Sequence, residues 1–385
     1  MIRKSLKNVF FAGAMALCIF ALLAGCAERA EPGVPDPVKW AQIVESGQIL
    51  NARVLSFEVS YSGENESGDK TTLFTAEITS GEAKGTKVSG RIVELGHLNY
   101  KVAPLRVGSR IFVRPDIGED GMPMCGFEDY DRTWGLIFIV VLFAVILCII
   151  GGMKGFRSLV ALIVTCLGLA LIFIPMVRAG QSPVGASLLV CTLVTIATLL
   201  IIGGVGVKTI SSLLGIMTGV FTAGVLVAIM QSVMRLTGLI DEHAQMLSVE
   251  GLDMNGLMFA AILIGALGAA MDVAVSLSSA LEELNIKTGM NGLELVRSGM
   301  KIGRDMMGTM TNTLVLAYVG GSLHLVMLLA TDLRQFGYII SWELLATEIL
   351  RAIAGSIGLI VIVPATSVIS ALLYRRKSGV SNPFS

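Results

Sequence analysis

The chain has 385 residues, of which 54% are hydrophobic and only 15% are charged, and its mean hydropathy is +0.77. This composition excludes an ordinary soluble protein and indicates a membrane protein. The formal net charge is zero, so the overall charge points to no nucleic-acid partner. The sequence has no CxxC pair and no Cys/His cluster with metal-ligand spacing. We therefore expect no metal site, no disulfide framework and no cofactor.

Residues 1–26 have the pattern of an export signal, with positive residues near the start and an apolar core from Val9 to Leu23. The run ends in the letters LAGC at Cys26. This ending resembles a bacterial lipobox, and the resemblance implies that Cys26 is lipidated. The alternative is an uncleaved signal anchor that happens to contain a cysteine. Both interpretations place the next residues outside the cytoplasm.

Residues 27–133 are predicted to form an extracytoplasmic domain with its linkers. A proline-containing linker covers 27–39, and short alternating runs separated by turn residues occupy 40–115. This pattern predicts a small all-β domain, a partly open barrel resembling an OB-fold. Because stacking aromatics are missing, a structural or docking role is favoured over a ligand site. The acidic segment 116–133 is interpreted as a solvated linker to the membrane.

Seven apolar runs follow, and each has roughly the ~20 residues that a helix needs to cross a bilayer. They cover residues 134–152, 158–177, 184–203, 210–233, 257–281, 310–330 and 349–373. We therefore expect a helical bundle over residues 134–374, followed by a tail at 375–385. Basic loops alternate with an acidic loop, as the positive-inside rule requires. This alternation predicts a bacterial plasma-membrane protein with its β-domain outside and its C-terminus in the cytoplasm.

One carboxylate, Asp272, lies inside the apolar run 257–281, where a charge is costly and is often functional. Helical periodicity places Asp272, Ser276 and Glu283 on one face. The polar face of the next run is formed by Asp305, Thr309, Asn312, Thr313 and, further out, His324. We expect the two faces to line one path, with oxygen atoms suited to a hard cation or a proton relay. Alternatively, Asp272 simply forms a hydrogen bond to a neighbouring helix.

The charged segment 282–308 joins these two runs and is predicted to be an interfacial helical segment. Arg304 and Asp305 could pair with Glu282 or Glu283 as a cytoplasmic gate. Alternatively, the basic residues of this segment only anchor the orientation of the protein in the membrane.

Two sequence blocks carry a family resemblance: GALGAAMDVA at 265–274 and SGMKIGRDMMGTMTNTL at 298–314. They resemble the bacterial YibE/F-like family of multi-spanning membrane proteins, and the later run EILR at 348–351 fits the same pattern. The resemblance covers about 45–373. It implies the overall architecture and directs attention to the polar residues of both blocks, but it supplies no settled activity. The lipobox-like Cys26 departs from the family, in which a plain spanning helix is usual.

Two hypotheses of function follow. The first is a transporter or permease-like protein for a small solute or ion that uses Asp272. The second is a non-transporting scaffold for envelope assembly or signalling that docks a protein partner through the β-domain. Both place the chain in a lipid bilayer, and both allow a homo-oligomer. Because the sequence contains no nucleotide-binding or hydrolase motif, we do not expect an enzyme.

Overall fold

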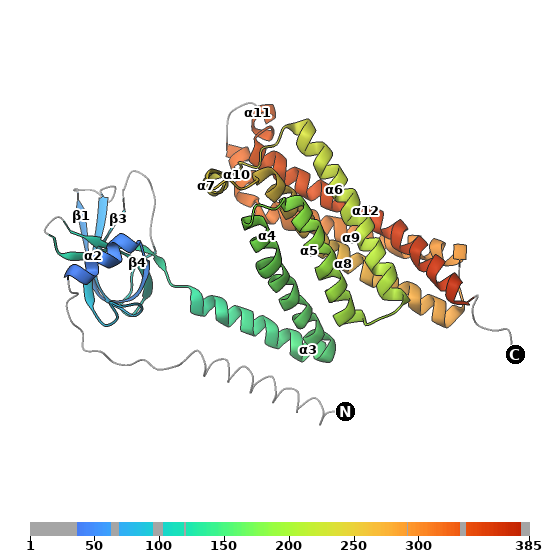
Figure 1. The fold of residues 1–385 in the computed structure, drawn as a ribbon, viewed down its shortest axis with the longest axis horizontal. Helices are drawn as coiled ribbons and strands as arrows, with labels where there is room; N and C mark the ends of the chain where they lie inside the picture. Colours follow the sequence, from blue (N-terminus) through green and yellow to red (C-terminus); the bar gives the residue numbers. More distant parts are fainter. Residues whose placement is uncertain are drawn as a thin grey trace, which may run out of the picture. The chain divides into compact units, whose positions relative to one another are not determined.

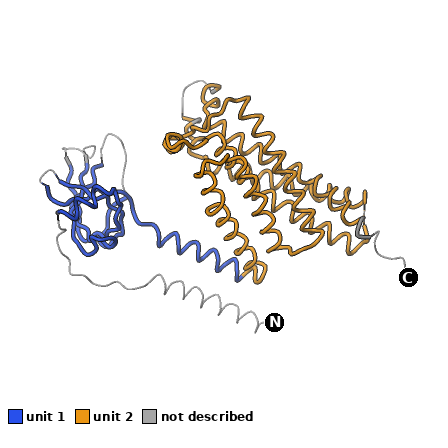
Figure 2. The backbone as a smooth tube through the Cα atoms, in the orientation of Figure 1, with its two compact units in different colours: residues 1–149 blue, residues 150–385 orange. Residues whose placement is uncertain are grey.

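The computed structural model describes residues 37–62, 69–94, 103–118, 121–290, 292–331 and 336–378. The chain divides into two compact units, residues 1–149 and 150–385, which Figure 2 shows in different colours. Each unit is described by itself. The predicted export signal, including Cys26, lies outside the described residues.

The first unit contains a closed five-stranded barrel with the strand order β1-β2-β3-β5-β4. The strands are β1 (Leu50–Ser62), β2 (Asp69–Ile78), β3 (Lys87–Glu94), β4 (Arg110–Ile117) and β5 (Pro123–Tyr130). Neighbouring strands are antiparallel, except that β3 and β5 are parallel. Along β3 every second side chain is buried, as expected for a strand with one face on a core. The prediction of a small all-β barrel is confirmed, but the barrel is closed and not partly open as expected.

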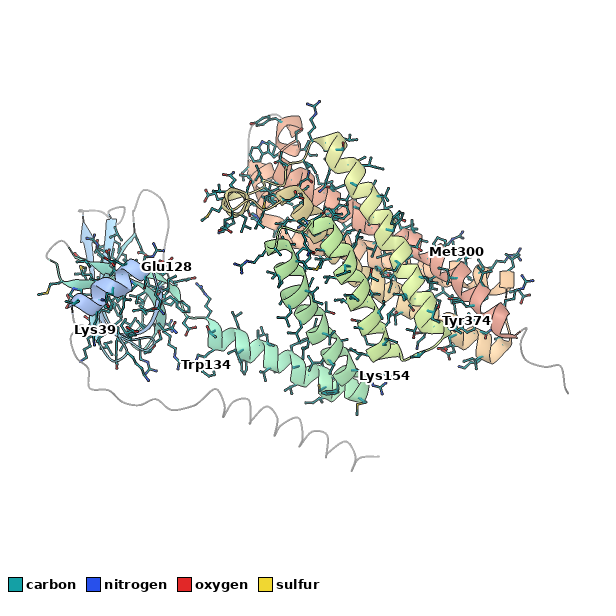
Figure 3. The ribbon with its side chains drawn as sticks, viewed as in Figure 1. Lys39, Glu128, Trp134, Lys154, Met300 and Tyr374 are labelled. Atoms are coloured by element: carbon teal, nitrogen blue, oxygen red, sulfur yellow. The ribbon has the colours of Figure 1, made fainter. Side chains whose placement is uncertain are left out.

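Two elements extend this domain beyond the predicted core at 40–115. Helix α2 (Pro37–Ser46) begins within the expected linker, and its Trp40 is buried and donates a hydrogen bond of 2.8 Å to the Asp116 carbonyl oxygen. Strand β5 forms inside the acidic segment 116–133, so the interpretation of that segment as a linker was wrong. Pairing with β3 and β4 satisfies its backbone groups. Its carboxylates remain outside the core, as Glu128 does on the barrel (Figure 3).

Among the described residues, five helical stretches are long and apolar enough to cross a membrane. The first joins α3 (Thr133–Gly168), the π-helical turn η2 (Leu169–Phe173) and α4 (Ile174–Arg178). The others are α5 (Pro183–Gly203), α6 (Val207–Met234), α8 (Met254–Thr288) and α12 (Glu343–Ser378). The short helices α7 (Glu242–Val249) and α11 (Phe336–Ile340) precede α8 and α12.

The first stretch contains a break that separates two of the predicted apolar runs. At Gly152 the backbone has φ 54° and ψ −133°, a conformation that is essentially restricted to glycine. The break lies at the boundary between the runs 134–152 and 158–177. The run 310–330 is divided between α9 (Gly292–Gly321) and α10 (Leu323–Thr331), which are not among the five stretches. The count of about seven spans therefore stays a prediction.

The charged segment 282–308 is not a separate element, contrary to our prediction. Helix α8 continues to Thr288 and is closed by Gly289 in a left-handed conformation, the usual helix C-terminal signal. Helix α9 begins at Gly292 and runs without interruption into the following apolar sequence. The charges of this segment therefore lie on the adjoining ends of two long helices.

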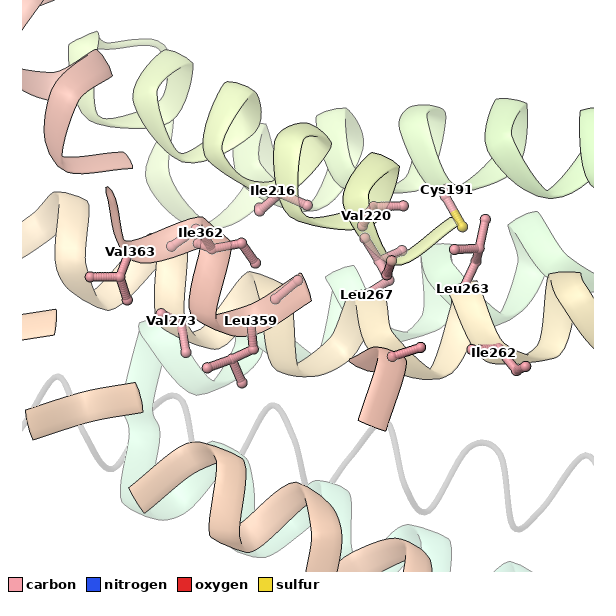
Figure 4. Packing of buried hydrophobic residues seen from close by; sticks show 14 of the residues in the cluster. Cys191, Ile216, Val220, Ile262, Leu263, Leu267, Val273, Leu359, Ile362 and Val363 are labelled. Carbon is pink, nitrogen blue, oxygen red and sulfur yellow. The ribbon is translucent and has the colours of Figure 1, made fainter. Parts of the chain in front are cut away.

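Helix α12 packs against α6, α8 and α9 in the second unit (Figure 1). Glycines allow this close approach: a Cβ atom added at Gly215 or Gly219 would overlap Thr366 or Ile362, and one added at Gly303 would overlap Val363. Around these contacts, large apolar side chains from α6, α8 and α12 form the core (Figure 4). Examples are Ile216, Leu263 and Leu359, which are almost completely buried.

Candidate functional site

A cleft of about 520 Å³ lies in the second unit between the second half of α3, η2, α5 and α8. Most of its lining is apolar. Polar atoms come from Ser158, Thr165, Thr198, Asp272 and Ser276. A cleft of this size with a few polar groups in an apolar wall has the character of a small-molecule site.

Helix α8 places Asp272 on the cleft by turning its other side to the core. Val273 and Ala274 are fully buried, whereas Asp272 and Ser276, one turn apart, are exposed and line the cleft. In the part of the chain that the structure describes, the Asp272 carboxylate has no hydrogen-bond or ion-pair partner. Among the described residues, Asp272 therefore does not form the hydrogen bond to a neighbouring helix that the alternative interpretation requires. The carboxylate is available to a ligand in the cleft.

A hydroxyl group on α5 also lacks a described hydrogen-bond partner. In membrane helices, serine and threonine usually donate to the carbonyl oxygen one turn earlier, and Thr165 does so to Ala161 at 3.0 Å. The Thr198 hydroxyl oxygen is buried and has no such partner among the described residues. Thr198 and Asp272 both line the cleft, so two polar groups without internal partners occur in one site.

The polar face predicted on α9 does not line this cleft. Thr309, Asn312 and Thr313 are exposed on the outside of α9, and none of them is among the lining residues. Gly265 of α8 lies beside Tyr318 of α9, and Gly299 lies beside Leu281. This antiparallel register brings Asp272 to the depth of residues near 311. Equal depth does not fix the rotation of each helix, which explains why the sequence pattern could not place the two faces together.

The predicted gate residues are not paired with one another in the structure. Glu283 pairs with Lys287 at 2.5 Å, and Glu282 lies 3.8 Å from Lys208. Arg304 and Asp305 form no ion pair within the described ranges. Since Gly299 lies beside Leu281, Arg304 is more than one helical turn from the level of Glu283.

The remaining candidate, His324, belongs to a different helix from the polar face that it was expected to continue. Helix α9 ends at Gly321, and His324 lies in the first turn of α10. The chain makes a turn at Ser322 between the two helices. The spacing from Thr313 to His324 therefore does not describe one continuous helical face.

The sequence analysis did not select an ion pair on α12 as part of a site. The Arg351 guanidinium lies 2.7 Å from the Glu348 carboxylate, and the side chains are only 22% and 16% exposed. Ser322, between α9 and α10, donates to the same carboxylate at 3.1 Å. Of the ion pairs that the described helices form, this is the most buried. Its signal in the sequence is a Glu and an Arg three residues apart at the start of an apolar run.

Comparison with known proteins gives one match. No curated protein and no solved structure matches the chain. The profile of the family described as YibE/F-like protein matches residues 139–376, a range that includes the cleft, Asp272 and the Glu348–Arg351 pair and begins after the barrel. This range is more than half of the 385 residues. The chain therefore belongs to the YibE/F-like family, as its sequence blocks predicted.

Proposed function

We propose that this membrane protein is a transporter or permease-like protein for a small solute or cation, and that Asp272 binds the transported species. The observation that carries the proposal is the carboxylate without a described partner, in a largely apolar cleft between helices that can cross a membrane. Retaining a carboxylate at membrane depth is costly unless it has a function. The free oxygen atoms match the ligands that protons and hard cations prefer.

The proposed path enters the cleft and uses Ser276 and Thr198 beside Asp272. The exposed Ser276 hydroxyl group can replace part of the hydration shell of a bound ion or solute, and the buried Thr198 hydroxyl can do so after its side chain turns toward the cleft. The proposal gives no role in this path to Thr309, Asn312 or Thr313, because they do not line the cleft. It includes the orientation inferred from the basic loops, with the barrel outside the cytoplasm and the C-terminus inside.

The test is flux in proteoliposomes that contain the purified full-length protein, with protons, monovalent cations and divalent cations as separate probes. We expect a flux with the unaltered protein that is lost in Asp272→Asn, a variant of nearly the same volume without the charge. The matched control is Glu250→Gln, which removes a carboxylate from the exposed turn between α7 and α8. An equal flux for Asp272→Asn and Glu250→Gln would contradict the proposal, provided both variants elute as folded protein.

An alternative function is supported by the barrel surface. Phe57, Val59 and Tyr61 of β1 are 37%, 42% and 62% exposed, and exposed apolar side chains grouped along a strand often mark a protein contact. Under this alternative the barrel docks an envelope protein and the helices only anchor it. Replacing Val59 and Tyr61 by Ser would then abolish cross-linking of the barrel to a partner in the cell envelope. Asp272→Asn would leave that cross-linking unchanged. The opposite pattern would exclude the docking role.

A further inference from the structure

Helix α9 carries an exposed face, polar in its first half, that nothing in the described chain covers. We define this outer face by residues at spacings of four, three, four and four, which fall on one side of a helix. They are Asp305, Thr309, Asn312, Leu316 and Gly320, and all of them are exposed. The face lies outside the cleft, so the proposed transport path does not account for it.

The glycines of α9 distinguish its two sides. On the inner side, a Cβ atom at Gly299 or Gly303 would overlap Ser367 or Val363 of α12. On the outer side, a Cβ atom at Gly308 or Gly320 would have no atom of the described chain within 4 Å. Glycine in a helix costs up to about 1 kcal/mol relative to alanine, and in membrane helices it is retained where another helix approaches closely. The inner glycines have such a neighbour, whereas the outer ones do not.

The outer face lies at the depth of the hydrocarbon if α12 crosses the bilayer. Helix α9 runs antiparallel along α12, with Gly303 beside Val363 and Leu314 beside Gly355. Both contact residues of α12 belong to its membrane-spanning stretch. The Asn312 amide has no hydrogen-bond partner within the described ranges. At this depth water cannot supply a hydrogen-bond partner for the amide. A neighbour with polar groups is therefore needed to cover the face.

We propose that this neighbour is a second copy of the same chain, docked through the outer face of α9 about a two-fold axis along the membrane normal. In such an isologous contact, each residue faces the same or a nearby residue of the other copy. An asparagine amide both donates and accepts, so two Asn312 side chains can bond to each other. Arg304 and Asp305 are adjacent, oppositely charged and without an ion pair in the described chain. The symmetry brings the Asp305 of each copy to the level of the Arg304 of the other.

This complementarity distinguishes a second copy from the other possible occupants. Lipid chains offer no partner for an amide or a carboxylate. A different protein could offer one, but Asp305 at one end of the outer face and the adjacent Arg304 at its edge already supply opposite charges at one depth. A surface that complements itself in this way favours a homodimer.

The first experiment measures proximity and copy number in the full-length protein reconstituted in nanodiscs or left in native membranes. We expect Asn312→Cys to form a disulfide-linked dimer on mild oxidation. Met310→Cys is the matched control, since it lies at the same depth on a different side of α9. The unaltered protein, with its six native cysteines, provides the background. Stepwise photobleaching of a labelled protein should give two copies per particle. Single copies, which a lipid or a different protein on this face would produce, would overturn the proposal.

The second experiment tests the charge arrangement. Asp305→Arg leaves only positive charge at that end of the face, so we expect the dimer to be lost. The double variant Arg304→Asp/Asp305→Arg restores one charge of each sign at the same depth, and we expect the dimer to return. Recovery in the double variant shows that the loss in the single variant was not misfolding. A dimer that persists in Asp305→Arg, or one that cross-links through Met310→Cys and not through Asn312→Cys, would contradict this interface.

Discussion

Two ionisable side chains show how local surroundings separate a structural residue from a candidate functional one. Cys125 is 2% exposed in the barrel, where its thiol donates to the Ser89 carbonyl oxygen at 3.5 Å. Burial raises the pKa of this thiol to about 12, because the charged thiolate would lose its hydration. Asp272 has no described partner and lines a cleft. The cysteine is therefore held inert, whereas the carboxylate can bind a ligand.

The raised pKa of Cys125 predicts slow alkylation of the folded barrel. The pKa is raised, so the thiolate is depleted at any pH below about 12. At pH 8 we expect roughly a thousandfold less thiolate than for an ordinary cysteine, and only the thiolate is nucleophilic. Iodoacetamide labelling, followed by peptide mass spectrometry, should modify Cys125 only after denaturation. Labelling of Cys125 in native buffer at the rate of a free thiol would show that the barrel interior is open.

At the residue scale the sequence predicted which side chains are unusual, but not which of them meet. A carboxylate within an apolar run identified Asp272 directly, because composition alone makes it exceptional. The position of Asn312 outside the cleft could not be predicted, since a helical period gives the face of one helix and not its direction toward another. Glu348 and Arg351 were missed as a site because charges near a helix end resemble an ordinary membrane boundary.

At the scale of elements, glycine position determines how closely helices pack. Helix α12 meets α6 at Gly215 and Gly219 and meets α9 at Gly299 and Gly303. Each contact places the backbone of a glycine against a side chain of α12 and gains dispersion energy. The glycine has no side-chain entropy to lose in this contact. These positions tolerate no Cβ atom without a movement of the facing helix.

The contact at Gly303 can be tested with one methyl group. We expect Gly303→Ala to lower the free energy of unfolding by about 1–3 kcal/mol, because the methyl group overlaps Val363. Gly185→Ala on α5 is the control, since a Cβ atom there has nothing within 4 Å. It should be neutral or stabilise the helix by up to about 1 kcal/mol. Thermal unfolding in one detergent compares the two variants, and equal shifts would refute the packing argument.

Element boundaries were predicted wrongly where charged residues were interpreted as a linker or as a separate segment. Strand β5 lies in an acidic segment, yet its backbone pairs with two strands while Glu128 and Asp129 project outward. Likewise the charged residues 282–308 continue two helices, because an exposed helix end accepts charge without breaking. In both places the backbone hydrogen bonds determine the structure, and they leave little trace in composition.

At the scale of the whole molecule, the two units have separate hydrophobic cores. Trp40, Leu50 and Ile111 belong to the core of the barrel, and no described residue of the helical unit belongs to that cluster. The family match at 139–376 begins after the last strand of the barrel. The sequence also predicts a β-domain followed by a helical domain, because alternating and continuous apolar patterns occupy different parts of the chain.

Separate cores predict that the barrel folds without the membrane helices. A fragment of residues 37–131 contains one tryptophan, Trp40, which is 1% exposed. We expect the fragment to be soluble, to show blue-shifted Trp40 emission, and to unfold in urea in one cooperative step with a red shift. Removing the indole contact to Asp116 by Trp40→Phe should move the midpoint to lower urea concentration; far-ultraviolet circular dichroism follows unfolding of both proteins, since the variant has no tryptophan. Red-shifted emission in native buffer would mean that the barrel depends on the rest of the chain.

The length of α8 has a mechanical consequence. Its 35 residues span about 50 Å at 1.5 Å per residue, whereas the hydrocarbon core is only about 30 Å thick. The excess end continues through Gly289 into α9, and Leu281 packs beside Gly299. The two helix ends therefore form a hairpin, which would project beyond the hydrocarbon if this end of α8 carries the excess length. Because the hairpin is continuous with the helix that carries Asp272, a tilt of α8 about the cleft would displace the tip of the hairpin.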